Sequence, residues 1–135
     1  MTETVCVAPR ERVLDDRLLE FAVGVGRFVK ALPADSSGRH LAIQLLKSGT
    51  APMAHYAEAT EAESWRDYVH KMKIGLKELR ETMNWLRYAH SSALSDPESV
   101  SALTKQCDTL IAIHVSCINT ARHKRKGPHP KRPKD

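Results

Sequence analysis

The chain contains seven histidines and three cysteines, the residues best suited to holding a metal ion or activating a nucleophile. His114 and Cys117 are three residues apart, and His55-x-x-Glu58 reverses the Glu-x-x-His order found in di-iron helical bundles. The other histidines are too widely spaced to complete a set of metal ligands. These patterns predict no metal and no cofactor, with His114 as a core or interface histidine.

No pattern indicates an enzyme. The sequence has no glycine-rich phosphate loop, and nothing marks a base and an orienting group beside a serine or cysteine nucleophile. Cys6, Cys107 and Cys117 form no Cys-x-x-Cys pair, and the last two lie about 15 Å apart along one helix, too far to bridge. Free thiols are typical of a reducing compartment. Without a signal peptide or an apolar run of about 18 residues, we expect a cytoplasmic protein with no membrane span.

The formal net charge of +5 is concentrated at the C-terminus. Residues 1–122 carry fifteen basic and fifteen acidic side chains, which cancel. Residues 123–135 carry Asp135 and six basic residues, namely Lys124, Arg125, Lys126, Lys131, Arg132 and Lys134. Three prolines, one glycine and no apolar anchor predict that this tail is disordered. Its cations can neutralise nucleic-acid phosphates with little sequence preference, but a tail that only keeps the protein in solution fits the composition equally well.

A second basic group follows one predicted helix. Its members recur at helical spacing and are Lys73, Lys77, Arg80 and Arg87. Together they would extend a phosphate-binding surface. Glu78 and Glu81, which lie among them in sequence, favour an ordinary mixed, exposed face instead.

Apolar residues in steps of three and four predict an all-α fold of four helices. The first is expected to end at Pro33, the second to follow the turn at residues 35–38, the third to follow Ser64, and the fourth to run from Pro97 to near Arg122. A seven-residue repeat beginning at Tyr68 indicates that the third helix contacts two neighbours. Short connections favour an antiparallel up-down-up-down four-helix bundle over residues 10–122, with a flexible leader at 1–9 and the disordered basic tail at 123–135.

Helix ends and breaks have their own signals. Ser64 with Asp67 reads as a capping box, and Asp96 or Ser95 can cap the helix that starts at Pro97. Pro52 falls inside the second helix, where it removes one backbone hydrogen bond and predicts a kink, with a complete break as the alternative.

Small residues indicate where helices come close together. Gly24 and Gly26 weaken the first helix by about 1 kcal/mol each relative to alanine, and we expect close approach by a neighbouring helix to compensate.

Three glutamates, Glu58, Glu61 and Glu63, cluster at the corner between the second and third helices. They form either an acidic patch that binds a partner or cation, or an ordinary solvated corner. Glu58 lies between two alanines and is expected to be partly buried. A structural or oligomer-contact role is assigned to Gly49, Pro52, His55, Glu58, Trp65 and Tyr68.

Three separated segments resemble one known family. They are Leu14…Arg17…Phe21-Ala22…Val25, then GRHLAIQLLKSGTAPMAHYAEATEAES at 38–64, then DYVHKMKIGLKELRETMNWL at 67–86. The chain resembles the bacterial four-helix-bundle proteins encoded in intervening sequences of 23S ribosomal RNA genes. The resemblance covers residues 12–122 and is most specific over residues 38–88. That family also includes the accessory variability determinant of diversity-generating retroelements. His55 replaces the family's usual asparagine, and Pro52 occupies a position that often holds a small or β-branched residue.

The resemblance implies a ring-shaped homo-oligomer, typically a pentamer, and among relatives a basic surface that binds nucleic acid and a reverse transcriptase. We therefore expect a non-enzymatic oligomeric binding or scaffold protein that contacts RNA, DNA or a nucleic-acid enzyme through its basic surface and tail. The alternative is a protein–protein adaptor with no role in nucleic-acid binding.

Overall fold

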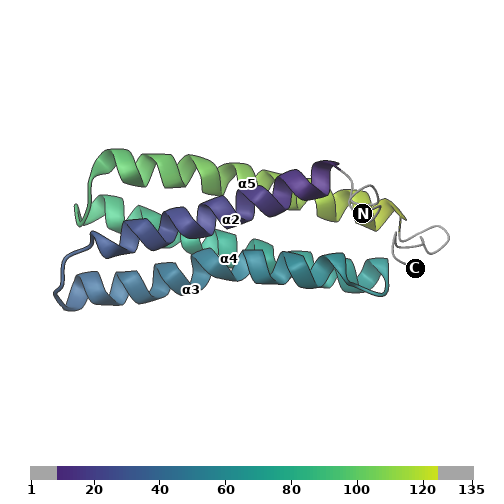
Figure 1. Cartoon of the computed structure of the whole chain (residues 1–135), viewed down its shortest axis with the longest axis horizontal. Helices are drawn as coiled ribbons and strands as arrows, with labels where there is room; N and C mark the ends of the chain where they lie inside the picture. The colour runs from purple at the N-terminus through teal and green to yellow at the C-terminus, as the bar shows by residue number, and fades with distance from the viewer. Residues whose placement is uncertain (1–8, 125–135) are drawn as a thin grey trace, which may run out of the picture.

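A computed structural model describes residues 9–124, with side chains from Val13 onward. These residues form four α-helices and no strand: α2 (Pro9–Lys30), α3 (Ser36–Thr60), α4 (Trp65–Ser91) and α5 (Pro97–Lys124). Successive helices run in opposite directions, and the start of α2 and the end of α5 lie at the same end of the molecule (Figure 1). The predicted antiparallel up-down-up-down four-helix bundle is confirmed.

Each helix packs against two neighbours. The order around the bundle is α2, α3, α4, α5 and back to α2, and no Cα atoms of diagonally opposite helices come within 8 Å of each other. The seam between α2 and α3 is therefore on the opposite side of the bundle from the seam between α4 and α5. This arrangement decides which surface features can share a face.

The predicted heptad positions form the core. On α2, Leu14, Leu18, Phe21 and Val25 are at most 2% exposed. The other helices contribute buried positions at the same spacing, namely Leu41 and Leu45 on α3, Met72, Leu79 and Leu86 on α4, and Val100, Leu103, Cys107, Leu110, His114 and Cys117 on α5. One continuous apolar core thus runs the length of the bundle.

Side chains cap three helices, and the caps at Ser64 and Asp96 are among those that the sequence predicts. The Asp35 Oδ1 accepts a hydrogen bond from the Gly38 backbone N–H at 2.8 Å, and the Ser64 Oγ accepts one from Asp67 at 3.0 Å. At the start of α5, Asp96 Oδ2 accepts from the Ser99 N–H at 3.1 Å. Each cap satisfies a backbone donor that has no partner within its own helix.

Some helix boundaries differ from the expected ones. Helix α2 ends at Lys30, three residues before Pro33, and α5 continues through Lys124, two residues past Arg122. Helix α3 runs without a break from Ser36 to Thr60 although Pro52 lies buried inside it. The alternative of two helices separated at Pro52 is therefore wrong.

Two glycines mark close helix approaches. A Cβ built on Gly49 would lie 2.9 Å from Val25 Cγ2, so α2 and α3 pack too closely there for a side chain. On Gly24 it would lie 3.3 Å from Leu103 Cδ2 of α5. Gly26 has no such neighbour within 4 Å, so the expectation of a close approach at Gly26 is wrong. Gly26 faces outward because it is two residues, or about 200° of helical rotation, beyond Gly24.

Candidate nucleic-acid interface and assembly face

A row of cations follows the side of α4 that adjoins α5. Lys73, Arg80 and Arg87 are seven residues apart, so two helical turns separate neighbours and all three lie along one strip. This strip adjoins the α5 seam, where Leu79 accepts a hydrogen bond from the Cys107 thiol of α5. We call the cations of this strip, with Lys77 beside them, the α4 basic flank.

The acidic residues of α4 lie on a different side of the helix. Glu81 Oε2 accepts a hydrogen bond from Trp85 Nε1 at 3.1 Å, and the Trp85 ring packs edge-on against His40 of α3 at 5.6 Å. Trp85 is therefore on the α3 side, about 140° around the helix from Arg80. By the same geometry Glu78 is about 160° and Glu81 about 100° from Arg80, but Glu81 is only about 40° from Lys77. The two glutamates do not interrupt the row of Lys73, Arg80 and Arg87, although Glu81 shares a face of α4 with Lys77.

Arg66 extends the α4 basic flank by two further turns toward the start of the helix. It is exposed and lies seven residues before Lys73. Sequence reasoning missed it because it lies inside the Ser64–Asp67 capping box, although the seven-residue spacing was a signal that could have found it. Arg66, Lys73, Lys77 and Arg80 have no ion-pair partner among residues 9–124, and Arg87 donates to the Asn84 side chain at 3.3 Å.

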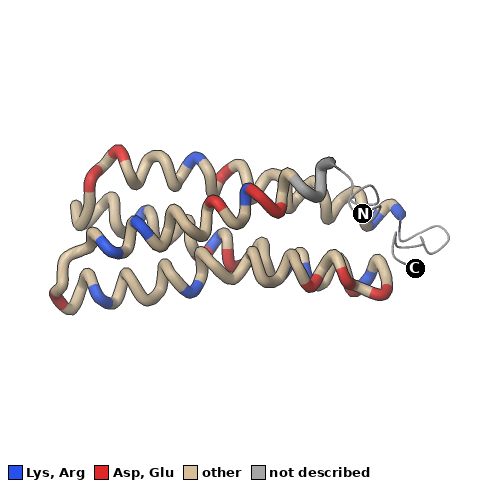
Figure 2. The backbone as a smooth tube through the Cα atoms, in the orientation of Figure 1, with Lys and Arg blue, Asp and Glu red and all other residues tan. Residues whose placement is uncertain are grey.

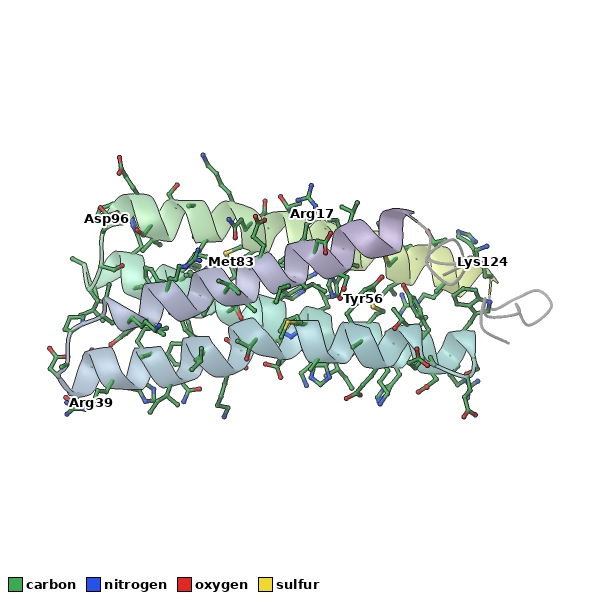
Figure 3. All side chains as sticks on the ribbon, viewed as in Figure 1. Arg17, Arg39, Tyr56, Met83, Asp96 and Lys124 are labelled. Atoms are coloured by element: carbon green, nitrogen blue, oxygen red, sulfur yellow. The ribbon has the colours of Figure 1, made fainter. Side chains whose placement is uncertain are left out.

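Lys124 is the one predicted tail cation that the structure places. It ends α5, at the opposite end of the bundle from Arg39 and Asp96 (Figure 3). Its ammonium nitrogen lies 5.9 Å from the centre of the Trp65 ring, a cation–π contact that ties the end of α5 to the start of α4. Trp65 also meets Tyr68 edge-on, with ring centres 5.6 Å apart. The other predicted tail cations, Arg125, Lys126, Lys131, Arg132 and Lys134, lie outside the described residues.

The acidic corner is open to solvent. Figure 2 shows acidic residues gathered where α3 passes into α4, at the same end of the bundle as Lys124. Glu58 is exposed, so its expected partial burial is wrong. Its carboxylate accepts a hydrogen bond from the Lys71 ammonium at 3.0 Å, and this bond together with the lysine charge lowers the pKa of Glu58. Glu58 therefore helps to join α3 to α4.

An apolar surface covers the outer side of α2 and α3. Leu19 and Val23 on α2 and Ile43 and Leu46 on α3 are 43–59% exposed. On α2, Gly24 faces α5, and Leu19 lies about 140° around the helix from Gly24. On α3, Ser48 bonds to α4, and Leu46 lies about 160° around the helix from Ser48. Both leucines thus border the seam between α2 and α3. We call Leu19, Val23, Ile43 and Leu46 the α2/α3 apolar face.

Buried polar residues hold the interior together. Thr82 Oγ1 is 2.8 Å from Ser48 Oγ of α3 and also bonds to the Glu78 carbonyl. Thr82 belongs to the repeat that begins at Tyr68, and Gly75, Thr82 and Ala89 of that repeat are all buried. The prediction that α4 contacts two neighbours is confirmed, because Thr82 meets α3 while Leu79 meets α5.

The candidate metal residues do not assemble into a metal site within residues 9–124. No group of three or more histidine, cysteine, aspartate or glutamate side chains is placed to hold an ion there. His114 and Cys117 are both buried in the core, and His55 is half-buried on α3.

Cys107 is predicted to be unreactive in the folded protein. Burial, with a smaller effect of Asp108, raises the pKa of its thiol to about 12. At pH 8 the thiolate fraction is then about a thousandfold below that of an ordinary cysteine. Alkylation followed by mass spectrometry should label Cys107 in denaturant and leave it intact in native buffer. Equal labelling rates under the two conditions would contradict this expectation.

These features define a four-helix-bundle protein with one basic flank and one apolar face. The chain belongs to the family of 23S rRNA-intervening sequence proteins, whose family model matches residues 16–116. It is also similar to a solved structure of a protein of unknown function from the S23 ribosomal protein family of Bacteroides thetaiotaomicron VPI-5482. The two share 30% sequence identity and superpose with a TM-score of 0.73 over 78% of this chain and 97% of the other. The comparison with curated proteins found no match.

No helix within residues 9–124 combines the length and apolar character that crossing a membrane requires.

Proposed function

We propose that this protein is a non-enzymatic, homo-oligomeric scaffold that binds RNA or DNA through the α4 basic flank and the C-terminal basic residues. The observation that carries the proposal is the row formed by Arg66, Lys73, Arg80 and Arg87, which spans about 31 Å of one helix at 1.5 Å per residue. Exposed cations without ion-pair partners are free to displace counterions from a phosphate backbone. Because phosphate contacts carry no sequence information themselves, binding through this row should show little sequence preference.

The α2/α3 apolar face supports the oligomeric part of the proposal. It lies opposite the α4–α5 seam in the order of helices around the bundle. Copies that assemble through this apolar face would leave the α4 basic flank of every copy accessible. A ring of five copies, the assembly expected from the sequence resemblance, would present five such flanks, and their combined binding would strengthen individually weak phosphate contacts.

A salt-dependent titration tests the nucleic-acid part of the proposal. We expect Lys73→Ser, Arg80→Ser and Arg87→Ser together to weaken binding of a mixed-sequence RNA or DNA by about tenfold to a hundredfold, and to reduce the slope of log affinity against log salt by about 3. The matched control removes three exposed lysines elsewhere, Lys30→Ser, Lys47→Ser and Lys105→Ser, and should change both quantities much less. Equal losses in the two triple variants would refute a role for the α4 basic flank.

The contribution of the C-terminal basic residues is separable from that of the flank. A chain ending at Lys124 lacks five basic residues and one acidic residue. If the tail contributes phosphate contacts, this shortened chain should bind more weakly and with a shallower salt dependence. Unchanged binding would restrict the function to the folded bundle.

A protein–protein adaptor is the second candidate, and the α2/α3 apolar face is the observation that favours it. A monomer in solution would leave these apolar side chains available to a different protein, including a reverse transcriptase or another nucleic-acid enzyme. Capture of a partner that survives nuclease treatment, and that Leu46→Asp abolishes, would support this alternative.

A further inference from the structure

The feature with the most unused chemistry is a histidine in the centre of the bundle. His114 of α5 is fully buried, with 0% of its surface exposed. Its Nδ1 lies 2.9 Å from the carbonyl oxygen of Leu110. A carbonyl only accepts hydrogen bonds, so Nδ1 carries the proton, and in the neutral ring Nε2 is then an acceptor. That Nε2 atom is buried and has no hydrogen-bond partner.

The space beside Nε2 is set by Gly75 of α4. A Cβ on Gly75 would lie 3.3 Å from His114 Nε2 and 3.8 Å from the Cβ of His55 on α3. The glycine thus makes room for the imidazole of His114 and lies beside the Cβ of His55. His55 Nδ1 is also buried without a partner. Residues of α3 and α5 therefore both approach α4 at Gly75, and each is a histidine with one buried ring nitrogen that has no hydrogen-bond partner.

Among the described side chains, residues 13–124, no carboxylate lies within hydrogen-bond distance of Nε2. The titratable residue of α3 next to this site is His55. The α4 residue next to the ring is Gly75, and the nearest charged residue on α4, Lys71, lies one turn away and forms an ion pair with Glu58. Helix α2 contributes Leu14 and Leu18 to the same core, with Arg17 between them exposed to solvent. On α5 the direct partner of the ring is the Leu110 carbonyl.

We propose that His114 is an acid-sensitive lock on the packing of α5 against α4. The neutral ring fills the space beside Gly75 at neutral pH. Protonation at Nε2 would create a buried cation whose new N–H has no hydrogen-bond partner in the present packing, and movement of α5 away from α4 would relieve this cost by admitting water. Because α4 carries the basic flank along this same seam, acid would loosen that surface too. The proposal does not depend on nucleic-acid binding.

The direction of the pH effect follows from proton binding. Burial lowers the pKa of His114, and the Leu110 hydrogen bond opposes this shift only in part. The unfolded chain, with an ordinary histidine pKa near 6.5, therefore binds the proton more readily than the folded chain. Stability is fully present above about pH 7.5. As the pH falls below about 6.5, the equilibrium constant for unfolding rises by up to about tenfold per pH unit. This rise stops when the pH reaches the lowered pKa of His114 in the folded state.

Hydrogen exchange and denaturant unfolding at pH 7.5 and 5.5, at one fixed protein concentration, test the proposal in the full chain. Protection factors, corrected for intrinsic exchange, are compared for the amides of α5 near His114. Between pH 7.5 and 5.5 these factors should fall about tenfold more in the natural protein than in His114→Phe. The aromatic replacement fills the ring's volume but cannot be protonated. His70→Gln, at an exposed histidine of α4, is the matched control and should keep the natural pH response. Equal acid sensitivity of the natural protein and His114→Phe would overturn the proposal.

A titration of the natural protein keeps the test independent of how His114→Phe folds. Histidine NMR signals should show His114 as the neutral Nδ1–H form at about pH 6.5, the ordinary pKa of histidine. His114 should become protonated only together with the loss of protection in α5. If His114 titrates at the ordinary histidine pKa, or becomes protonated while α5 stays fully protected, the lock does not exist.

Discussion

Replacing Gly38 with alanine is expected to lower the free energy of unfolding by about 3 kcal/mol. A Cβ at this position would overlap the carbonyl oxygen of Pro33 and lie 2.8 Å from its carbonyl carbon. These are backbone atoms, so no rotamer change relieves the clash, and the connection between α2 and α3 must move. That movement would also disturb the hydrogen bond from the Gly38 N–H to Asp35, a helix cap worth about 1 kcal/mol.

Gly26→Ala is the matched control for this experiment. It makes the same change inside α2, where nothing lies within 4 Å of the new Cβ. Alanine is favoured over glycine in a helix by about 1 kcal/mol, so this variant should gain about 0.5–1 kcal/mol. Urea unfolding of both variants at one protein concentration measures the contrast. The steric explanation fails if Gly38→Ala proves as stable as Gly26→Ala.

These two glycines show how far sequence reasoning reaches for the fold. The spacing of apolar residues was sufficient to predict the four helices, because a helix buries one stripe and positions such as Leu14 and Leu79 repeat along that stripe. The roles of the glycines could not be predicted in the same way. Whether a glycine meets a backbone atom, as Gly38 does, or faces open space, as Gly26 does, depends on how the neighbouring segments pack.

The same limit applies to the α4 basic flank. The sequence identified Lys73, Lys77, Arg80 and Arg87, and Glu78 and Glu81 favoured an ordinary mixed face. Which neighbouring helix these cations adjoin could not be read from the sequence, and the contacts of Thr82 with Ser48 and of Cys107 with Leu79 determine it. A sequence repeat gives the angle between residues on a helix, but only a tertiary contact orients that angle toward a neighbour.

The α2/α3 apolar face was also hidden from sequence reasoning. Leu46 lies beside Leu45 in sequence, yet Leu45 is fully buried while Leu46 is 45% exposed. Helices of a bundle commonly carry a few apolar residues outside the core stripe, and such single residues need no explanation. The structure shows that Leu19 and Leu46 both border the seam between α2 and α3. The exposed apolar residues therefore form one shared surface, which is a candidate for assembly.

The final prediction concerns this surface. Leu19→Asp with Leu46→Asp should convert the proposed oligomer to a monomer at micromolar concentration. Each copy would lose two leucines that the proposed contact buries, and the introduced carboxylates would have to be desolvated. We therefore expect the dissociation constant of the oligomer to rise at least about a hundredfold. Ala102→Asp, at an exposed position on α5, adds a carboxylate away from the apolar face and should leave the assembly intact.

Light scattering coupled to size exclusion distinguishes the outcomes, with circular dichroism to check that each variant keeps its helices. Both leucines are 45% or more exposed in the single chain, so their replacement should cost the folded monomer little. A helical monomer in the double variant, beside a natural protein whose mass is several times that of one chain, is the expected pair of results. A natural protein that is itself monomeric would contradict the oligomeric scaffold, and the α2/α3 apolar face would then favour the adaptor.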